Sequence, residues 1–117
     1  VYTLEIIAEL AASADKRLKS IGYSNIFVKA GDGWYGWPEA APFDGILVTA
    51  VVPEIPPQLL TQLAVGGKLV IPVGHARGNQ ELVLITRHSP DEISSKDILP
   101  VRFVPFTGEG ILTLRER

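Results

Sequence analysis

The chain has 117 residues, of which 46% are hydrophobic and 21% charged, and 11 Lys and Arg against 13 Asp and Glu give a net charge of −2. These values are typical of one globular domain, and without a basic block we expect no nucleic-acid partner. The sequence has no cysteine, which excludes disulfides and thiolate metal sites. No apolar run reaches the roughly 18 residues of a membrane span, so we expect no membrane partner.

The first third of the chain predicts two short strands around a helix. VYTLEI, at residues 1–6, is apolar and β-branched, as in a buried strand, and NIFVKAGD, at residues 25–32, has the same character. Residues 8–21 have helical apolar spacing, and Gly22 follows where a left-handed cap would end a helix. The expected apolar face of this helix consists of Leu10, Ala14, Leu18 and Ile21.

The remaining sequence predicts four strands and one short helix. FDGILVTAVV, at residues 43–52, reads as a strand, and Pro57 suits the first turn of a helix over residues 57–63. Further strands are expected at residues 68–74, 81–89 and 99–106. The charges between the last two strands predict a solvated loop; they are Asp91, Glu92, Lys96 and Asp97.

This order of elements predicts an α/β fold in a single domain over residues 1–117. The early strands alternate with helices, which favours parallel pairing, and the last strands follow short loops, which favours antiparallel pairing. In open parallel sheets, ligands bind beyond the carboxyl ends of the strands. This rule selects three positions, namely Glu5, Asp32-Gly33 and residues 49–53.

Two acidic residues lie where such a ligand would bind. Glu5 stands among apolar neighbours at the end of the first strand, and Asp32-Gly33 follows the second. Glu5 is either an edge glutamate in water or an acceptor for ribose hydroxyls. Asp32-Gly33 is either a turn or an acceptor for an exocyclic amine such as adenine N6. Taken together, the two acids indicate a nucleoside site.

The aromatic residues and histidines give weaker signals. Trp34, Tyr35 and Trp37 either cover the sheet end or wall a ligand cleft, and we expect cover for at least one of them. His75 and His88 fit no metal signature, and the sequence has no G-x-S-x-G nucleophile elbow. We therefore predict no metal site and assign no catalytic residue.

One long stretch of motifs resembles a known family. GDGWYGWPEAAPFDGILVTAVVPEIPPQLLTQLAVGGKLVIPVG, at residues 31–74, is followed by VRFVPF at residues 101–106. In their order and spacing, the GDG-W-GW, APFD, P-x-IP-x-x-L, GG-x-L-V-x-PVG and VRFVP elements resemble the protein-L-isoaspartate (D-aspartate) O-methyltransferases. TLEII is similar to the strand of that family that carries its ribose-binding acid. The resemblance covers residues 1 to about 107.

The resemblance implies a Rossmann-like methyltransferase fold with S-adenosylmethionine as the cofactor. It implies a cytoplasmic enzyme that methylates the carboxylate of L-isoaspartyl or D-aspartyl residues in damaged proteins, as part of protein repair. Isoaspartyl-containing proteins and peptides are then the expected partners. The implied cofactor residues are Glu5, Ile6, Asp32, Gly33 and Thr107. The implied peptide-binding residues are Ala50, Val51, Val52, Pro53, Val101, Phe103 and Val104.

Such a reaction needs no general base, because a carboxylic acid with a pKa of about 4 is already ionised at neutral pH. The absence of a catalytic dyad is therefore compatible with an enzyme. We also expect LPVRFVPF, at residues 99–106, to form an extended segment beside residues 51–53, with free backbone groups that could pair with an extended peptide.

The glycine-rich first motif of the family would precede residue 1, as would a segment with the serine and threonine that face the substrate. We therefore expect a partial methyltransferase domain without the central first strand, which would lie between the strands at residues 1–6 and 43–52. More residues of a longer polypeptide would supply it; alternatively a second chain does so, or the flanking strands pair directly. Two other functions stay open, a nucleoside-binding module without transfer activity and a structural fragment of a longer or split enzyme.

Overall fold

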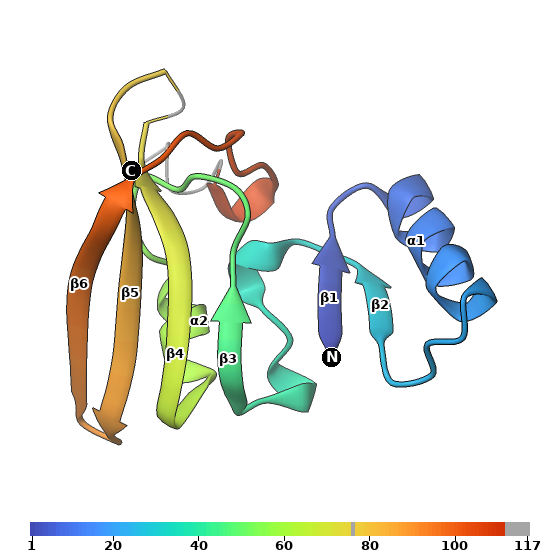
Figure 1. Ribbon diagram of the computed structural model, residues 1–117, viewed down its shortest axis with the longest axis horizontal. Helices are drawn as coiled ribbons and strands as arrows, with labels where there is room; N and C mark the ends of the chain where they lie inside the picture. The colour runs from blue at the N-terminus through green and yellow to red at the C-terminus, as the bar shows by residue number, and fades with distance from the viewer. Residues whose placement is uncertain (76, 112–117) are drawn as a thin grey trace. The chain divides into compact units, whose positions relative to one another are not determined.

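The computed structural model describes residues 1–75 and 77–111, which form two compact units (Figure 1). The first unit comprises Val1–Gly36 together with the described residues 107–111, and the second comprises Trp37–Phe106. Helices and strands alternate in the first half of the chain, and the α/β class expected from the sequence is confirmed. The single-domain organisation stays a prediction.

The first unit is built on two parallel strands and a helix. β1 (Tyr2–Glu5) pairs in parallel with β2 (Phe27–Ala30), and α1 (Ala8–Ser20) connects them. Tyr2 lies opposite Phe27 in the register, and the two rings stack with their centroids 5.1 Å apart. The short 3-10 helix η1 (Gly33–Tyr35) follows β2.

The end of α1 confirms the expected glycine cap. Gly22 has a φ of 99°, which only glycine adopts readily, and its N–H donates to the Lys19 carbonyl at 3.1 Å. The Tyr23 N–H donates to the Leu18 carbonyl at 3.1 Å, which completes a Schellman motif. The expected apolar face of α1 is not buried throughout, because Leu10 and Ile21 are exposed and Ala11 is the buried residue of the helix. A sheet of two strands offers too little surface to cover a whole helix face.

The second unit is a mixed sheet with the order β3-β4-β5-β6 (Figure 1). β3 is parallel to β4, whereas β4 and β5, and β5 and β6, are antiparallel, which confirms the expected change of direction. The 3-10 helix η2 (Pro38–Ala40) precedes the sheet. The other elements are β3 (Phe43–Leu47), α2 (Pro57–Thr61), β4 (Leu63–Gly74), β5 (Gln80–Ser89) and β6 (Glu92–Pro100).

The core of this unit lies where α2 meets the two central strands. In β4 and β5 the buried residues alternate with less buried ones, and the register places Leu69 opposite Ile85 and Ile71 opposite Val83. Side chains on one face of a strand repeat every second residue, so these cross-strand pairs form one apolar surface. Leu59 of α2 packs against it.

The structure corrects the last predicted strand. The strand expected at residues 99–106 is wrong, since β6 runs from Glu92 to Pro100 and so includes three of the four charged residues assigned to a solvated loop; only Asp91 stays in a turn. All nine residues of β6 are exposed. β6 pairs only with β5 in the described sheet and has water on both faces, so polar residues are compatible with it.

β1 belongs to the two-stranded sheet and β3 to the four-stranded sheet, and the three ways of filling the expected gap stay predictions. Within the described ranges, no helix combines the length and the apolar character that crossing a membrane requires.

Candidate functional site

The predicted site residues divide cleanly between the units. All of the residues expected to hold the cofactor belong to the first unit, and all of those expected to line the peptide site belong to the second. The two sets are therefore built on different structural supports.

The two acids of the expected nucleoside site lie at the same end of the β1–β2 sheet. Glu5 is the last residue of β1 and pairs with Ala30, the last residue of β2, so Asp32 follows two residues beyond that pair. The Gly31 N–H donates to the Glu5 carbonyl at 3.0 Å, and this bond extends the contact between the two strands at this end. Both acidic residues are half-buried, and Glu5 Oε1 accepts from the Ile7 N–H at 3.2 Å. The next residue after Glu5, Ile6, is exposed.

Asp32 fixes the local backbone with both of its carboxylate oxygens. Its Oδ1 accepts from the Trp34 N–H at 2.9 Å, as an N-cap of η1 does, and Gly33 is the first residue of that helix. Its Oδ2 accepts from the Gly110 N–H at 3.0 Å. A carboxylate has about four lone-pair sites, so each oxygen keeps capacity for a further donor. The turn and the acceptor readings of Asp32 are thus compatible.

Two glycines after Thr107 pack closely on this turn. Gly108 has a φ of 130°, and a Cβ on it would stand 2.6 Å from Asp32 Oδ2. A Cβ on Gly110 would collide with the Trp34 ring. Thr107 itself is exposed, one residue before this contact. Sequence analysis missed both glycines, although the G-E-G spacing directly after Thr107 was a signal for a close backbone approach.

Among the aromatic residues, Trp34 is buried, as expected of a covering side chain, while Tyr35 is exposed. In the second unit, the Trp37 N–H donates to Oε1 of the buried Gln62 at 2.9 Å.

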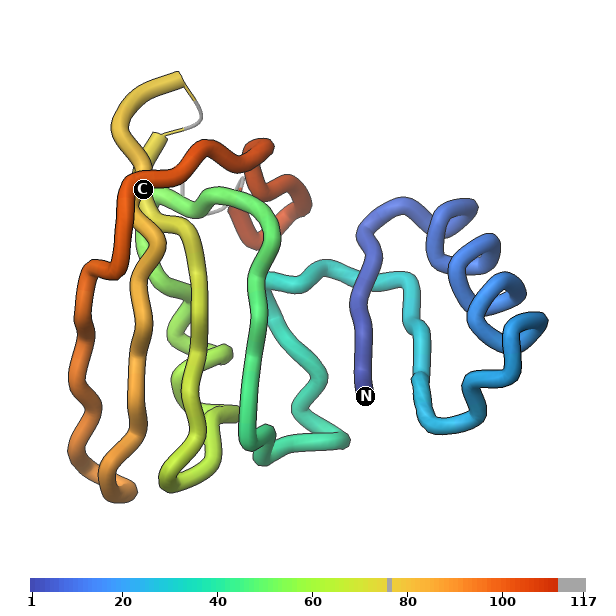
Figure 2. The backbone as a smooth tube through the Cα atoms, viewed as in Figure 1, coloured from blue at the N-terminus to red at the C-terminus, as the bar shows by residue number. Residues whose placement is uncertain are grey.

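In the second unit, residues 101–106 lie beside Val51, as expected from the sequence. The Val51 N–H donates to the Val104 carbonyl at 2.8 Å, and the Phe106 N–H donates to the Val51 carbonyl at 2.9 Å. Val51 and Pro105 form a parallel bridge. Figure 2 shows this segment in dark orange, crossing the end of the sheet near the green chain that follows β3. Regular pairing of β3 stops at Leu47, five residues earlier than expected for the strand at residues 43–52.

Val51 and Val52 support the segment from inside the fold. Both side chains are buried. The Val52 N–H donates to the Pro72 carbonyl at 3.1 Å, and the Val52 carbonyl accepts from the Gly74 N–H at 2.9 Å. Pro53 is exposed and Ala50 is half-buried. The peptide-binding role assigned to residues 50–53 stays a prediction. Of these residues, Ala50 and Pro53 are the ones that a peptide could reach from solvent.

At Arg102 both main-chain polar groups, the N–H and the carbonyl, are without a hydrogen-bond partner in the described part of the chain, residues 1–75 and 77–111. Val101 and Phe103, on either side, are half-buried, and Val104 is 68% exposed. This alternation is that of an extended segment with one side-chain face toward solvent.

The described part of the chain gathers no group of three His, Asp or Glu residues that could hold a metal ion. His88 Nε2 instead lies 2.7 Å from Ser94 Oγ, at an exposed position between β5 and β6.

A parallel strand pair with acids at its carboxyl ends, together with a mixed sheet that ends in antiparallel strands, defines an α/β protein whose Glu5 and Asp32 lie at the sheet end where such folds bind ligands. The family model of protein-L-isoaspartate(D-aspartate) O-methyltransferase (PCMT) matches residues 1–110, and the chain belongs to this family.

Curated relatives and solved structures agree with the family. A protein-L-isoaspartate O-methyltransferase 1 of Geotalea uraniireducens is 54% identical over 108 residues, which are 92% of this chain and 49% of the relative. A protein-L-isoaspartate O-methyltransferase 2 of Polaromonas sp. is 50% identical over 109 residues, which are 93% of this chain and 52% of the relative. The chain thus spans about half the length of the curated relatives it matches.

Two solved structures share the fold. A protein-L-isoaspartate O-methyltransferase superposes with a TM-score of 0.88 at 29% identity, covering 99% of this chain and 37% of that one. A putative protein-L-isoaspartate O-methyltransferase from Plasmodium falciparum, in complex with S-adenosyl-L-homocysteine, superposes with a TM-score of 0.78 at 26% identity, covering 92% of this chain and 52% of that one.

Proposed function

We propose that this protein transfers a methyl group from S-adenosylmethionine to the carboxylate of L-isoaspartyl or D-aspartyl residues in damaged proteins, in the cytoplasm. The observation that carries the proposal is the position of Glu5 and Asp32 at the same end of two parallel strands, within a chain that matches the family over residues 1–110. Proteins and peptides with isoaspartyl residues are the partners.

The residues of the first unit fit the nucleoside part of the cofactor chemically. Glu5 supplies carboxylate oxygens that suit the two ribose hydroxyls, and Asp32 keeps acceptor capacity for the adenine amine. Ile6 offers apolar surface next to Glu5, while Gly33 presents bare backbone next to Asp32. Thr107 precedes the glycine that contacts Asp32, which supports a place for it near the same ligand.

The residues of the second unit suit an extended peptide. The N–H and carbonyl of Arg102, which have no partner among residues 1–75 and 77–111, offer one hydrogen-bonded pair to a strand laid alongside, in the manner of β-augmentation. The exposed side chain of Val104 and the residues Ala50 and Pro53 supply contact on either side. Main-chain pairing does not depend on the peptide sequence, which suits a repair enzyme that meets many proteins.

The chemistry asks little of the protein beyond positioning. When bound, S-adenosylmethionine would supply an activated methyl group carried on a sulfonium. Transfer of that methyl group would leave a neutral thioether. The substrate carboxylate, with a pKa of about 4, is ionised at neutral pH, so no side chain has to remove a proton. The residues named above bind and orient the reactants and exclude water, and such orientation accounts for several kcal/mol of a barrier.

The proposal is tested by methyl transfer from radiolabelled S-adenosylmethionine to two peptides that differ in one linkage, isoaspartyl against normal aspartyl. We expect label in the base-labile ester of the isoaspartyl peptide and almost none in its control. Calorimetry with S-adenosylhomocysteine runs in parallel. Binding without transfer to either peptide would favour a non-catalytic nucleoside-binding module, and neither binding nor transfer would favour a structural fragment.

A further inference from the structure

Gln80, the first residue of β5, is a buried polar side chain that holds the main chain of another segment. It is 2% exposed. Its Oε1 accepts from the Phe103 N–H at 2.7 Å, and its Nε2 donates to the Phe103 carbonyl at 3.2 Å and to the His75 carbonyl at 3.1 Å. A buried amide without such partners costs roughly 1–3 kcal/mol, so these contacts fix both the side chain and the backbone it meets.

The Gln80 amide takes the place of a strand residue opposite Phe103. The β5–β6 ladder ends at the pair of Glu81 and Pro100, and one more backbone bond joins the Val101 N–H to the Gln80 carbonyl at 3.1 Å. An antiparallel ladder would next need a residue about two positions before Gln80. There the chain has already turned away, because the Gly78 N–H donates to the His75 carbonyl at 3.0 Å.

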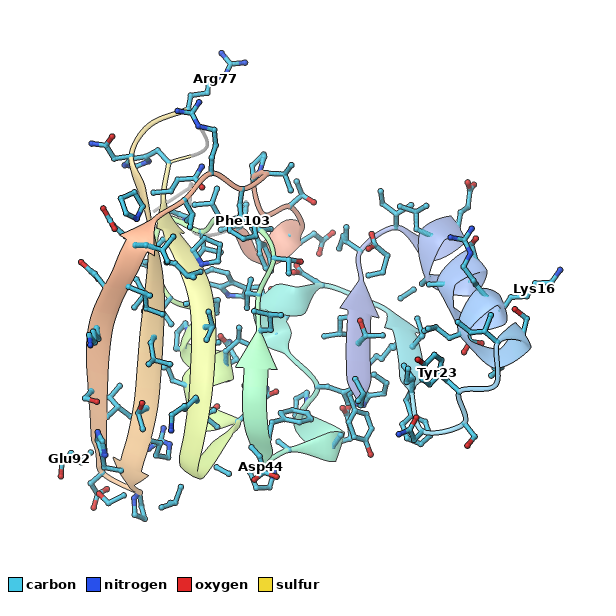
Figure 3. The ribbon with its side chains drawn as sticks, viewed as in Figure 1. Lys16, Tyr23, Asp44, Arg77, Glu92 and Phe103 are labelled. Atoms are coloured by element: carbon cyan, nitrogen blue, oxygen red, sulfur yellow. The ribbon has the colours of Figure 1, made fainter. Side chains whose placement is uncertain are left out.

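The position of the Gln80 amide opposite Phe103 decides which backbone groups of residues 101–104 have no hydrogen-bond partner. With Val101 held by the Gln80 main chain and Phe103 by its side chain, the N–H and carbonyl of the residue between them point to the other edge of the segment. That residue is Arg102, whose main chain has no partner among the described residues. Phe103, labelled in Figure 3, follows the end of β6.

We infer that Gln80 is a positioning residue for the peptide substrate, which it never touches. Its side-chain amide bonds to both the N–H and the carbonyl of Phe103 and so holds residues 101–104 extended. In this conformation the N–H and carbonyl of Arg102 are presented to an incoming peptide strand. The inference rests on the proposed function for its substrate, whereas the grip of Gln80 on Phe103, meaning the two hydrogen bonds between the Gln80 side chain and the Phe103 backbone, is a property of the free protein. The two parts are therefore measured separately.

The first measurement is amide hydrogen exchange in the protein without ligands. Gln80→Leu removes the amide at nearly constant volume, and we expect exchange of the Val101, Phe103 and Phe106 amides to rise about tenfold or more, as loss of a hydrogen bond predicts. Gln62→Leu is the matched control. Gln62 is also buried and bonds a backbone N–H, that of Trp37, but it precedes β4 whereas Gln80 follows it. This control should leave exchange at residues 101–106 unchanged.

The second measurement is steady-state methyl transfer to the isoaspartyl peptide. For Gln80→Leu we expect KM for the peptide to rise about tenfold, with kcat and the Kd for S-adenosylhomocysteine within about twofold of the parent values. Gln80→Glu keeps the acceptor for the Phe103 N–H but turns a second oxygen toward the two carbonyls. It should raise KM as well, and it serves if Gln80→Leu fails to fold.

The outcomes separate the inference from the proposed function. Faster exchange at residues 101–106 with an unchanged peptide KM would overturn the inference, because the grip would then be structural only. Unchanged exchange in a folded Gln80 variant would overturn it as well. If the parent protein binds cofactor but methylates no peptide, the proposed function fails and the substrate role of Gln80 falls with it, while the exchange result still decides whether the grip exists.

Discussion

At the scale of single residues, Asp32 combines a structural role in its turn with a proposed role in ligand binding. It caps η1 through the Trp34 N–H and ties the Gly110 N–H to the same turn, and it is also the proposed acceptor for adenine. Gly108 makes the second contact possible, because any larger residue would fill the space beside the Asp32 carboxylate. The turn is therefore sensitive to a change outside the family motifs.

Gly108→Ala should accordingly impair both stability and cofactor binding. The new methyl group meets Asp32 Oδ2 at 2.6 Å in a backbone conformation with φ of 130°, so we expect a loss of about 2–3 kcal/mol in the free energy of unfolding and a weaker affinity for S-adenosylhomocysteine by about tenfold. Urea denaturation and calorimetry measure the two effects.

Gly22→Ala is the matched control for this change. Gly22 also has a positive φ, of 99°, but a Cβ there meets no atom within 4 Å, so only the backbone term of about 1 kcal/mol is lost. Equal effects of the two substitutions on stability and on ligand affinity would argue against a special role of the Gly108 contact.

At the scale of elements, the sheet of the second unit is stabilised at its centre and open at its edge. β4 and β5 contribute the paired residues of the core, whereas β6 is exposed along its whole length. The free energy of folding should therefore depend on the strand in which an isoleucine is truncated.

Ile71→Ala and Ile98→Ala test this difference with the same chemical change. Ile71 of β4 is 0% exposed, and its truncation leaves a cavity, for which we expect a loss of about 2–5 kcal/mol. Ile98 of β6 is 45% exposed and should cost less than about 1 kcal/mol. Chemical denaturation followed by circular dichroism gives both values. A cost for Ile98→Ala as large as that for Ile71→Ala would mean that the exposed face of β6 is covered in solution.

At the scale of the whole molecule, the two units differ in how much apolar surface each buries. The core cluster lies entirely in the second unit, while the first unit has a sheet of two strands with exposed aromatic residues, among them Tyr2 and Phe27. Two-stranded sheets have little stability of their own, and regions with few buried contacts open locally.

Hydrogen exchange followed by mass spectrometry should reveal this difference directly. We expect amides of β1 and β2 to exchange at least about tenfold faster than the central amides of β4 and β5, because they open at a lower free energy. Saturating S-adenosylhomocysteine should slow exchange in the first unit, since a ligand stabilises the state that it binds. Equal protection of all four strands without ligand would show that the units unfold together.

The sequence by itself determined the α/β class, the order of parallel and antiparallel strands, the helix that was expected at residues 8–21 with its Gly22 cap, and the family. These follow from signals carried within a few residues, such as hydrophobic period, a glycine after a helix or a motif with fixed spacing. It also placed Glu5 and Asp32 at one sheet end, because parallel neighbours bring their carboxyl ends together.

Only the tertiary structure decided what depends on partners distant in the sequence. β6 carries polar residues because it lies at an edge with water on both faces, which no local pattern distinguishes from a loop. Gly110 reaches Asp32 across 78 positions, and the Gln80 side chain reaches Phe103 across 23. Such contacts satisfy buried polar groups, and which groups become buried is settled only when the chain has folded.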